Sequence, residues 1–430
     1  MENSHGADFV RVFWQQPINY QDWRESNVSS SKQFLKYVDD LVWGVPLIVA
    51  ILLTGIYLTI RLKGIQITKL PKALKYMFEN EESGHGEVTS FGALCTALSA
   101  TIGTGNIVGV ATAIVAGGPG ALFWMEIAAL FGMATKYSEG LLAIKYRTTD
   151  KHGHILGGPF YYIENGMGKN GLAGKDFAFF GMGVGLFGIG TFTQVNGITS
   201  AVGNFFDPNA QNVIHLLGRD YTLAVVISGL ILTVCVGLVV IGGLKRIAKV
   251  SEIVVPFMAV IYITISLLLL ILNAGKIPAA VAEIVSSAFG MRAAAGGALG
   301  AIIVAMQKGI ARGIFSNEAG LGSAPIAAAA AQTKEPARQG LVTMTGTFID
   351  TIVVCTMTGL SIVITGSWNI GLEGVAVTTN AFQHGLPFAP QVSAFLLMMC
   401  LVFFAFTTIL GWDYYSERCL AYLSGSNKTA

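Results

Sequence analysis

Long apolar runs separated by short polar connections dominate this 430-residue chain. About twenty consecutive apolar residues are enough to cross the hydrocarbon core of a bilayer as a helix. Nine runs have nearly that length, at 42–62, 91–117, 119–144, 177–203, 221–243, 250–273, 296–331, 341–366 and 391–415. The pattern predicts an all-α polytopic membrane protein with about nine transmembrane helices.

The second run is interrupted in its middle. Between Ser99 and Gly109 it contains three glycines, three hydroxyl side chains and one amide, where a spanning helix is normally most apolar. Glycine weakens a helix, and Ser, Thr and Asn side chains offer partners to unwound backbone. Non-helical backbone persists at membrane depth only where protein encloses it or a cavity is present. We therefore expect a broken helix beside a binding site.

The seventh run is interrupted too, between Gln307 and Gly322, and its predicted direction is opposite to that of the second run. Two broken helices of opposite direction, one early in each half, are typical of inverted-repeat transporters. With the first span set aside as peripheral, the broken helices become core helices one and six. The predicted divisions are a polar extension over 1–40, a peripheral helix over 41–63, a first repeat over 88–274, an external helix over 275–295, a second repeat over 296–423 and a polar tail over 424–430.

The connection over 275–295 carries apolar residues at helical spacing, namely Ile277, Val281, Ile284, Val285 and Ala288. This spacing predicts an amphipathic helix. A lid over an outer vestibule and a helix that merely lies on the bundle are equally open interpretations.

Composition and charge agree with a membrane protein. Hydrophobic residues make up 53% of the chain and charged residues 12%, and the mean hydropathy is +0.61, which excludes an ordinary soluble domain. A net charge of +2 gives no indication of nucleic-acid binding. Basic residues concentrate in alternate connections, so the positive-inside rule places those connections in the cytoplasm, the N-terminus outside and the C-terminus inside.

Four sequence blocks resemble one transporter family. Residues 117–125 read GGPGALFWM, 158–163 read GPFYYI, 316–325 read SNEAGLGSAP and 406–412 read FTTILGW. Over about 40–423 the chain is similar to the alanine or glycine:cation symporter family. The resemblance implies a leucine-transporter-like fold of the amino acid-polyamine-organocation superfamily and a monomer in a prokaryotic inner membrane. It also implies secondary active symport of alanine or glycine with sodium, or less commonly with protons, with no enzymatic activity and no organic cofactor.

Two features depart from the family pattern. Glu126 stands where the family signature continues with Trp, which places an ionisable group near the outer end of a predicted span. The chain also ends where relatives continue with two further core helices, so the second repeat is expected to stop after core helix eight. A truncated, transport-inactive product is therefore one alternative.

A bound amino acid zwitterion needs donors for its carboxylate and acceptors for its ammonium group. We expect the amides of Thr104 and Gly105, at the positive end of the following half-helix, to bind the carboxylate. Carbonyls near Thr101, and near Lys308 and Gly309 in the second interruption, are candidates to accept from the ammonium. The small size of Gly105 would let a ligand approach the backbone.

The resemblance adds three residue types to this site. Asn106 resembles the family's amide at this turn, with a carbonyl suited to sodium and a nitrogen suited to substrate. Gln194 matches a substrate-contacting glutamine, although a lone Gln in a span often joins helices instead. Phe315 and Trp412 would bound the pocket and restrict it to small side chains.

A sodium site is expected between the first broken helix and the ninth run. It would use the carbonyls of Ser99 and Ile102 with the hydroxyls of Thr407 and Thr408, by analogy with the second sodium site of leucine-transporter-like proteins.

Two acidic residues lie in apolar surroundings and are candidates for coupling, Asp350 and Glu318. A second cation site, proton coupling, and a structural pairing with Lys308 or Arg312 are all open.

The favoured hypothesis is alternating access around a midplane site between lipid-embedded helices. An amino-acid-sensing membrane protein or a passive channel is a different class, since broken helices also form filters and receptor sites. Sodium versus proton, alanine versus glycine, D versus L handedness and stoichiometry stay open at this point.

Overall fold

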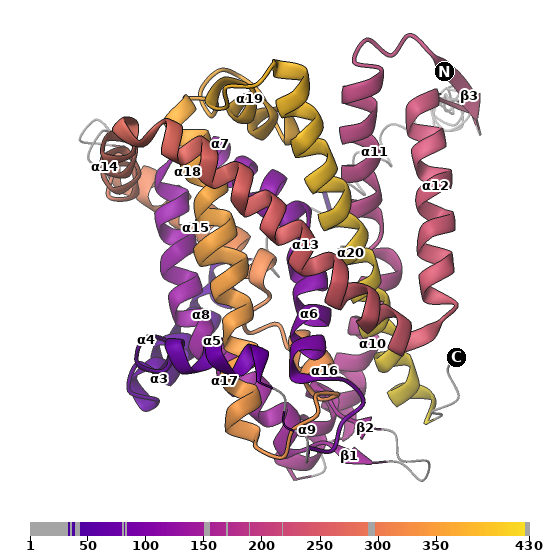
Figure 1. The fold of residues 1–430 in the computed structure, drawn as a ribbon. Coiled ribbons are helices and arrows are strands. Elements are labelled where there is room, and N and C mark those ends of the chain that lie inside the picture. The colour runs from indigo at the N-terminus through magenta and orange to yellow at the C-terminus, as the bar shows by residue number, and fades with distance from the viewer. Residues whose placement is uncertain are drawn as a thin grey trace, which may run out of the picture. The chain divides into compact units, whose positions relative to one another are not determined.

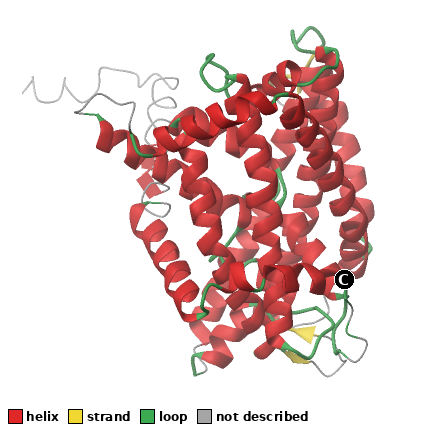
Figure 2. Cartoon of the chain, turned by 60° about the vertical axis from the view of Figure 1, so that its left-hand side comes forward, coloured by secondary structure: helices red, strands yellow, loops and turns green. Residues whose placement is uncertain are grey.

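The computed structural model describes residues 33–34, 37–38, 44–79, 81, 84–149, 155–168, 171–188, 190–216, 218–290 and 297–425. The chain divides into two units, residues 1–50 and 51–430. In the first unit the described residues are helical at 33–34, at 37–38 and from Val45 onward. In the second unit helices predominate and strands are few (Figure 2). The predicted polar extension over 1–40 and tail over 424–430 lie almost wholly outside the described residues.

The elements up to the end of the first predicted repeat follow the apolar runs closely. In chain order they are α3 (Val45–Arg61), α4 (Ile65–Thr68), α5 (Leu70–Phe78), α6 (Ser90–Thr101), the π-helix η1 (Gly105–Gly109), α7 (Val110–Gly117), α8 (Gly120–Lys145), β1 (Thr148–Thr149), β2 (Ile155–Leu156), α9 (Pro159–Gly166), α10 (Gly171–Phe187), α11 (Phe192–Phe206), β3 (Val213–Leu216), β4 (Arg219–Thr222), α12 (Leu223–Val240) and α13 (Gly243–Leu272). The strands form two antiparallel pairs, β1 with β2 and β3 with β4.

The remaining elements continue to the C-terminal end. They are the 3-10 turn η2 (Ala274–Lys276), α14 (Ile277–Ala288), α15 (Ala298–Asn317), α16 (Ala324–Ala328), α17 (Pro336–Thr347), the π-helix η3 (Phe348–Cys355), α18 (Thr356–Thr365), α19 (Val375–Gly385) and α20 (Pro390–Ser424). The interval η3 continues α17 into α18 without a break, so 336–365 is one long helix with a π-helical centre.

Each of the nine apolar runs corresponds to helical structure. Among the described residues, six helices are long and apolar enough to cross a membrane, or seven if α6 and the η1–α7 helix are counted as one bent span. Two of the nine runs match a helix outside that count. These helices are α3, which has 17 residues, and α8, which carries four charged residues, Glu126, Lys136, Glu139 and Lys145. The all-α polytopic class is confirmed, whereas the figure of nine spans and the repeat assignment stay predictions.

Helix α6 lies at the centre of the bundle. Every residue from Gly92 to Thr101 is buried, and α13, α17 and α20 all pack against the helix (Figure 1). Its first turn is capped by Thr89, whose Oγ1 accepts from the Gly92 amide at 2.9 Å. Because this helix carries the first interruption, its central position places that interruption inside the protein.

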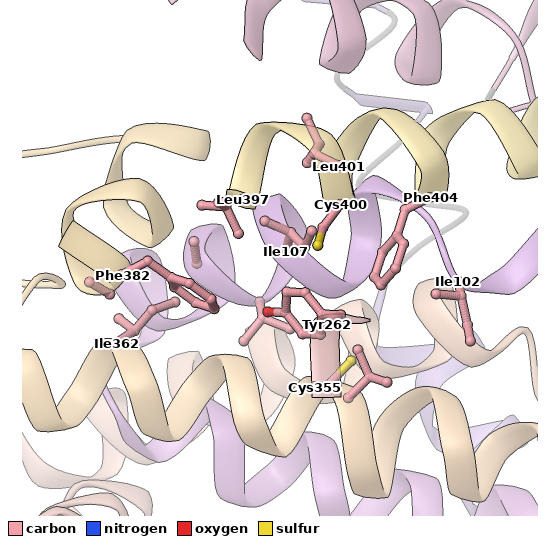
Figure 3. Packing of buried hydrophobic residues seen from close by; sticks show 14 of the residues in the cluster. Ile102, Ile107, Tyr262, Cys355, Ile362, Phe382, Leu397, Cys400, Leu401 and Phe404 are labelled. Atoms are coloured by element: carbon pink, nitrogen blue, oxygen red, sulfur yellow. The ribbon is translucent and has the colours of Figure 1, made fainter. Parts of the chain in front are cut away.

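An aromatic core packs beside the broken helix. Tyr262 of α13 lies with its ring 5.2 Å from that of Phe404 and 5.9 Å from that of Phe382. Figure 3 shows these rings next to Ile107 of η1. The Tyr262 hydroxyl is paired with Thr358 Oγ1 at 2.5 Å, which satisfies the polar end of a fully buried side chain. The half of the broken helix that follows the break is therefore held in closely packed surroundings.

The predicted amphipathic helix is present as α14. Its Ala280, Ile284 and Ala288 are buried, whereas Val281 is 45% exposed. The helix packs on α8, where Trp124 Nε1 donates to the Ala288 carbonyl at 3.1 Å. A role as a lid stays a prediction.

Candidate functional site

The first interruption falls where the sequence predicts it. Helix α6 ends at Thr101, residues 102–104 are not regularly helical, and the chain resumes as η1 and α7 at 51° to α6. From Thr101 to Ile107 all residues are buried except Gly105, which is partly exposed. Among residues 101–107, Gly105 is therefore the one whose backbone is accessible.

Asn106 holds the break in shape. Its Oδ1 accepts from the Gly103 amide at 2.9 Å, which fixes its Nδ2 as the donor on the other side. Gly103 N–H is the group that a continuous helix would direct to the Ser99 carbonyl. Because the Gly103 amide donates to Asn106 instead, the Ser99 carbonyl lacks its usual helical donor and is available to another partner.

The other face of Asn106 meets a buried carboxylate. Its Nδ2 donates to Asp350 Oδ1 at 2.7 Å and to the Asp350 carbonyl at 3.1 Å. Asp350 Oδ2 accepts from Ser316 Oγ at 3.0 Å and from Thr351 Oγ1 at 2.7 Å. Asp350 is fully buried, so these donors offset the loss of water around its charge. One carboxylate thus joins η1, α15 and η3.

Gln194 reaches the break from α11. Its Oε1 accepts from the Thr104 amide at 3.2 Å, and the side chain is buried. Gln194 therefore lies at the break, and its contact with a substrate stays a prediction. The Thr104 amide, predicted to bind a carboxylate, is occupied by Gln194 in this conformation, which leaves Gly105 as the more accessible of the two predicted donors.

The predicted sodium ligands are brought together only in part. Thr408 Oγ1 donates to the Ile102 carbonyl at 3.3 Å and to Phe404 O at 2.9 Å, so α20 touches the unwound end of α6. A Cβ atom on Gly103 would lie 2.4 Å from Thr408 Oγ1, so only glycine permits this approach. The Thr407 hydroxyl instead contacts Phe403 O, Phe404 O and, across to α13, Met258 Sδ.

The second interruption lies at the end of the predicted interval from Gln307 to Gly322. Lys308 and Gly309 are inside α15, which continues to Asn317, so the expectation of free carbonyls at these two residues is wrong. A Cβ on Gly309 would lie 2.1 Å from the Ala121 carbonyl. This glycine therefore allows α15 to pack closely on α8 rather than unwinding the helix.

The actual break spans 318–323. Glu318 has φ +55°, and Gly320 and Gly322 also have positive φ, which ends α15 before α16 begins. The buried Glu318 carboxylate accepts from the Ser323 hydroxyl, so Glu318 has a local partner within the break. Beside it, Glu139 Oε1 of α8 accepts from the Gly322 amide at 3.1 Å.

The two predicted aromatic boundaries lie on α15 and α20. Phe315 has the Arg312 guanidinium 5.4 Å from its ring centre. Trp412 is 8% exposed and lies edge-on to Tyr415 with ring centres 5.4 Å apart. Their place at the edge of a substrate pocket stays a prediction.

Comparison with known proteins identifies the family. A model described as "Sodium:alanine symporter family" matches residues 28–430. The chain belongs to the sodium:alanine symporter family. It is 55% identical over 396 residues to an uncharacterized transporter of Haemophilus influenzae, covering 92% of this chain and 83% of that protein. It is 48% identical over 400 residues to the sodium/alanine symporter AgcS of Methanococcus maripaludis, covering 90% and 83%. It is 37% identical over 403 residues to the probable sodium/glutamine symporter GlnT of Bacillus subtilis, covering 92% and 79%.

Membership of the sodium:alanine symporter family confirms the resemblance drawn from the four sequence blocks, and it makes this chain a transporter rather than an enzyme. Within this family member, sequence reasoning missed several residues at the site. Ser316 and Thr351 hold Asp350, while Lys136 and Glu139 are a buried charged pair of residues on α8. Lys136 and Glu139 could have been found from the sequence, because they are two charged residues three positions apart inside an apolar run.

Proposed function

We propose that this protein is a secondary active symporter that couples uptake of a small neutral amino acid, alanine or glycine, to sodium. The supporting observation is the enclosed break at residues 102–104, with Gly105 partly exposed and the Thr408 hydroxyl at the Ile102 carbonyl. Backbone groups released by a break bind a zwitterion without adding net charge to the protein interior. The name of the family supports sodium and alanine in these roles.

The substrate carboxylate is proposed to bind at the Gly105 amide, near the start of η1. The nearest side chain to a Cβ built on Gly105 is Ser316, whose Oγ would be 3.5 Å away, so the space in front of this glycine is narrow. Gln194 is proposed to exchange its bond with the Thr104 amide for a bond with the ligand. The carbonyl of Thr101 accepts from the ammonium group, and Phe315 and Trp412 restrict the side chain.

The cation is proposed to bind where α6 ends against α20. Sodium prefers oxygen ligands, and the Ser99 and Ile102 carbonyls and the Thr407 and Thr408 hydroxyls supply them. Thr408 has a second acceptor, Phe404 O at 2.9 Å. Its hydroxyl can therefore donate to Phe404 O alone and turn its lone pairs toward a cation.

Asp350 is proposed to supply the negative charge that balances the bound cation. It contacts both broken helices, through Asn106 and Ser316, so it can transmit a change at one break to the other. Glu318 is the second proposed coupling residue, since it lies in the second break itself.

Alternating access is proposed to move the broken helices relative to their surroundings. In this structure hydrogen bonds fix the segment just before the N-terminal end of α6, which starts at Ser90. Arg147, just after α8, donates to the carbonyls of Ala329, Ala331, Thr333 and His85 at 2.6–2.8 Å. Glu87 is paired with Arg418 of α20 at 2.8 Å. We propose that this network closes the cytoplasmic side.

The proposed location is a prokaryotic inner membrane, as a monomer with the N-terminus outside. Basic connections on alternate sides support this topology, because they place Arg147 and the Arg418 end of α20 in the cytoplasm.

The test is uptake of labelled alanine into proteoliposomes, with and without an inward sodium gradient, for the wild type and Asn106→Ala. We expect saturable, sodium-driven uptake that the variant loses. Removal of the Asn106 amide leaves the Gly103 N–H without its acceptor and Asp350 without its shortest donor from the broken helix. Competition by unlabelled glycine and glutamine then ranks the substrates. Alanine uptake that does not depend on the sodium gradient, or that Asn106→Ala leaves unchanged, contradicts the proposal.

A further inference from the structure

Four carboxylates are buried on α8, on η3 and in the second break, and three of them have identified partners. Asp350 accepts from three side chains, Glu318 from the Ser323 hydroxyl, and Glu139 from the Gly322 amide. The buried Lys136 also acts electrostatically on these three carboxylates. Each therefore has a donor and a nearby positive charge.

Glu126 is the fourth buried carboxylate, and within the described ranges it has neither a hydrogen-bond donor nor a nearby positive charge. Both of its carboxylate oxygens are buried, and in the described part of the chain neither has a hydrogen bond of normal geometry. Thr356 at the start of α18 is close enough to affect the Glu126 carboxylate but does not form a hydrogen bond of normal geometry with it. The charge that acts on Glu126 is that of Asp350, which is repulsive.

No positive charge offsets this repulsion among the described residues. From η3, the titratable groups near Glu126 are Asp350 and Cys355. The other helices that pack on α8 carry Lys308 and Arg312 on α15, Glu283 on α14 and Arg338 on α17, and none of these four is among the groups that act on Glu126. An ionised carboxylate in such surroundings is strongly unfavourable, and a bound proton removes the charge.

We propose that Glu126 carries a bound proton in this conformation and exchanges it with water as the broken helices move, so that the transport cycle is proton-linked. The inference rests on the proposed function. The exchange is a simple acid–base step: a carboxylate oxygen takes a proton from hydronium, leaving water, and the same O–H bond breaks when the proton returns. No other group is oxidised, reduced or transferred.

Asp350 provides the connection between the proton and the transport site. Its carboxylate is held by Asn106 of η1 and Ser316 of α15, so movement of either broken helix changes the donors around its charge. Because Glu126 feels that charge, its affinity for a proton differs between conformations. By reciprocity, protonation of Glu126 must then bias the position of the broken helices.

The experiment uses the full chain with Glu126→Gln, which keeps the shape of a protonated glutamate but cannot release a proton. Glu373→Gln, at an exposed glutamate before α19, is the matched control. Infrared spectra at neutral pH measure the C=O stretch of protonated carboxyl groups, before and after addition of sodium and alanine. Sodium-driven alanine uptake is then measured over a range of external pH.

We expect a protonated-carboxyl band that shifts on addition of sodium and alanine, that disappears in Glu126→Gln and that persists in Glu373→Gln. We also expect pH-dependent uptake in the wild type and the control, and a flat pH profile in Glu126→Gln. A band that survives in Glu126→Gln, or a pH profile that this variant leaves unchanged, overturns the inference. Absence of sodium-driven uptake in the wild type contradicts the proposed function instead, and the band still reports the proton on Glu126.

Discussion

At the scale of single residues, the contact between Thr408 and the Ile102 carbonyl determines what α20 contributes to the break. The 3.3 Å bond is longer than the 2.9 Å bond from the same hydroxyl to Phe404 O. It is therefore the weaker of the two and the one that a cation at the proposed site would replace. Thr407, by contrast, contacts its own helix and Met258, so the two threonines are not equivalent.

Thr408→Val tests this difference, because valine keeps the branched shape and removes the hydroxyl. We expect the sodium concentration for half-maximal uptake to rise about tenfold, a change of about 1.4 kcal/mol that is within the range for one lost polar ligand. Thr407→Val should have a smaller effect. The measurement is the sodium dependence of alanine uptake at saturating alanine.

Thr264→Val on α13 is the control for Thr408→Val, since Thr264 is exposed and its hydroxyl, among the described residues, bonds to the Val260 carbonyl of its own helix. An equal rise in the sodium requirement for Thr264→Val and Thr408→Val would show that the effect is structural and would remove Thr408 from the proposed cation site.

At the scale of elements, the sequence predicted both breaks but placed the start of the second one too early, for a physical reason. Around Asn106, glycines occur together with side chains that can cap unwound backbone, and both are needed to stabilise a break. Around Gly309 the glycine has no such caps, and it serves packing against Ala121 instead. Glycine can either weaken a helix at a break or allow close helix packing. The two cases are distinguished by the position of the neighbouring helix, which the sequence does not reveal.

Two glycines of α15 allow a matched test of the packing role. A Cβ on Gly309 would lie 2.1 Å from the Ala121 carbonyl, whereas a Cβ on Gly300 would have nothing within 4 Å. We expect Gly309→Ala to lower the melting temperature in detergent and to reduce uptake, since overpacking typically costs about 1–3 kcal/mol. Gly300→Ala should be neutral or stabilising by up to about 1 kcal/mol, because alanine favours the helix.

If Gly309→Ala melts at the same temperature as the wild type, the close approach of α15 to α8 is not a constraint on the fold. Unwinding at Gly309 would then become the better explanation for the glycine, and Lys308 and Gly309 would return to the list of site candidates.

At the scale of the whole molecule, the site depends on contacts that no local pattern predicts. Asn106 and Asp350 are 244 positions apart, and Thr408 and Ile102 are 306 apart. The sequence identified Asn106, Asp350 and Thr408 as candidates, because each is polar within an apolar run or matches a family block. It could not predict that Asp350 binds Asn106, nor that Ser316 and Thr351 complete its surroundings, because those partners are set by how the helices pack.

The network at the Ser90 end of α6 is also long-range, and its central pair is testable. Glu87 and Arg418 lie 331 positions apart, with side chains only 10% and 20% exposed. A pair so poorly hydrated depends on both partners, because removal of one leaves an uncompensated charge. We expect Glu87→Gln and Arg418→Gln each to reduce the rate of alanine uptake several-fold by weakening closure on this side.

The double variant Glu87→Gln with Arg418→Gln distinguishes closure from general damage. If the pair acts as one unit, the double variant should be no worse than the more impaired single variant, because the second substitution removes the charge that the first left unpaired. Glu87 Oε1 also accepts from the Ile155 amide at 2.9 Å, and glutamine retains an oxygen for that bond. Additive losses in uptake would mean that Glu87 and Arg418 act independently, and the proposed closure would then rest on Arg147 and its four carbonyl partners.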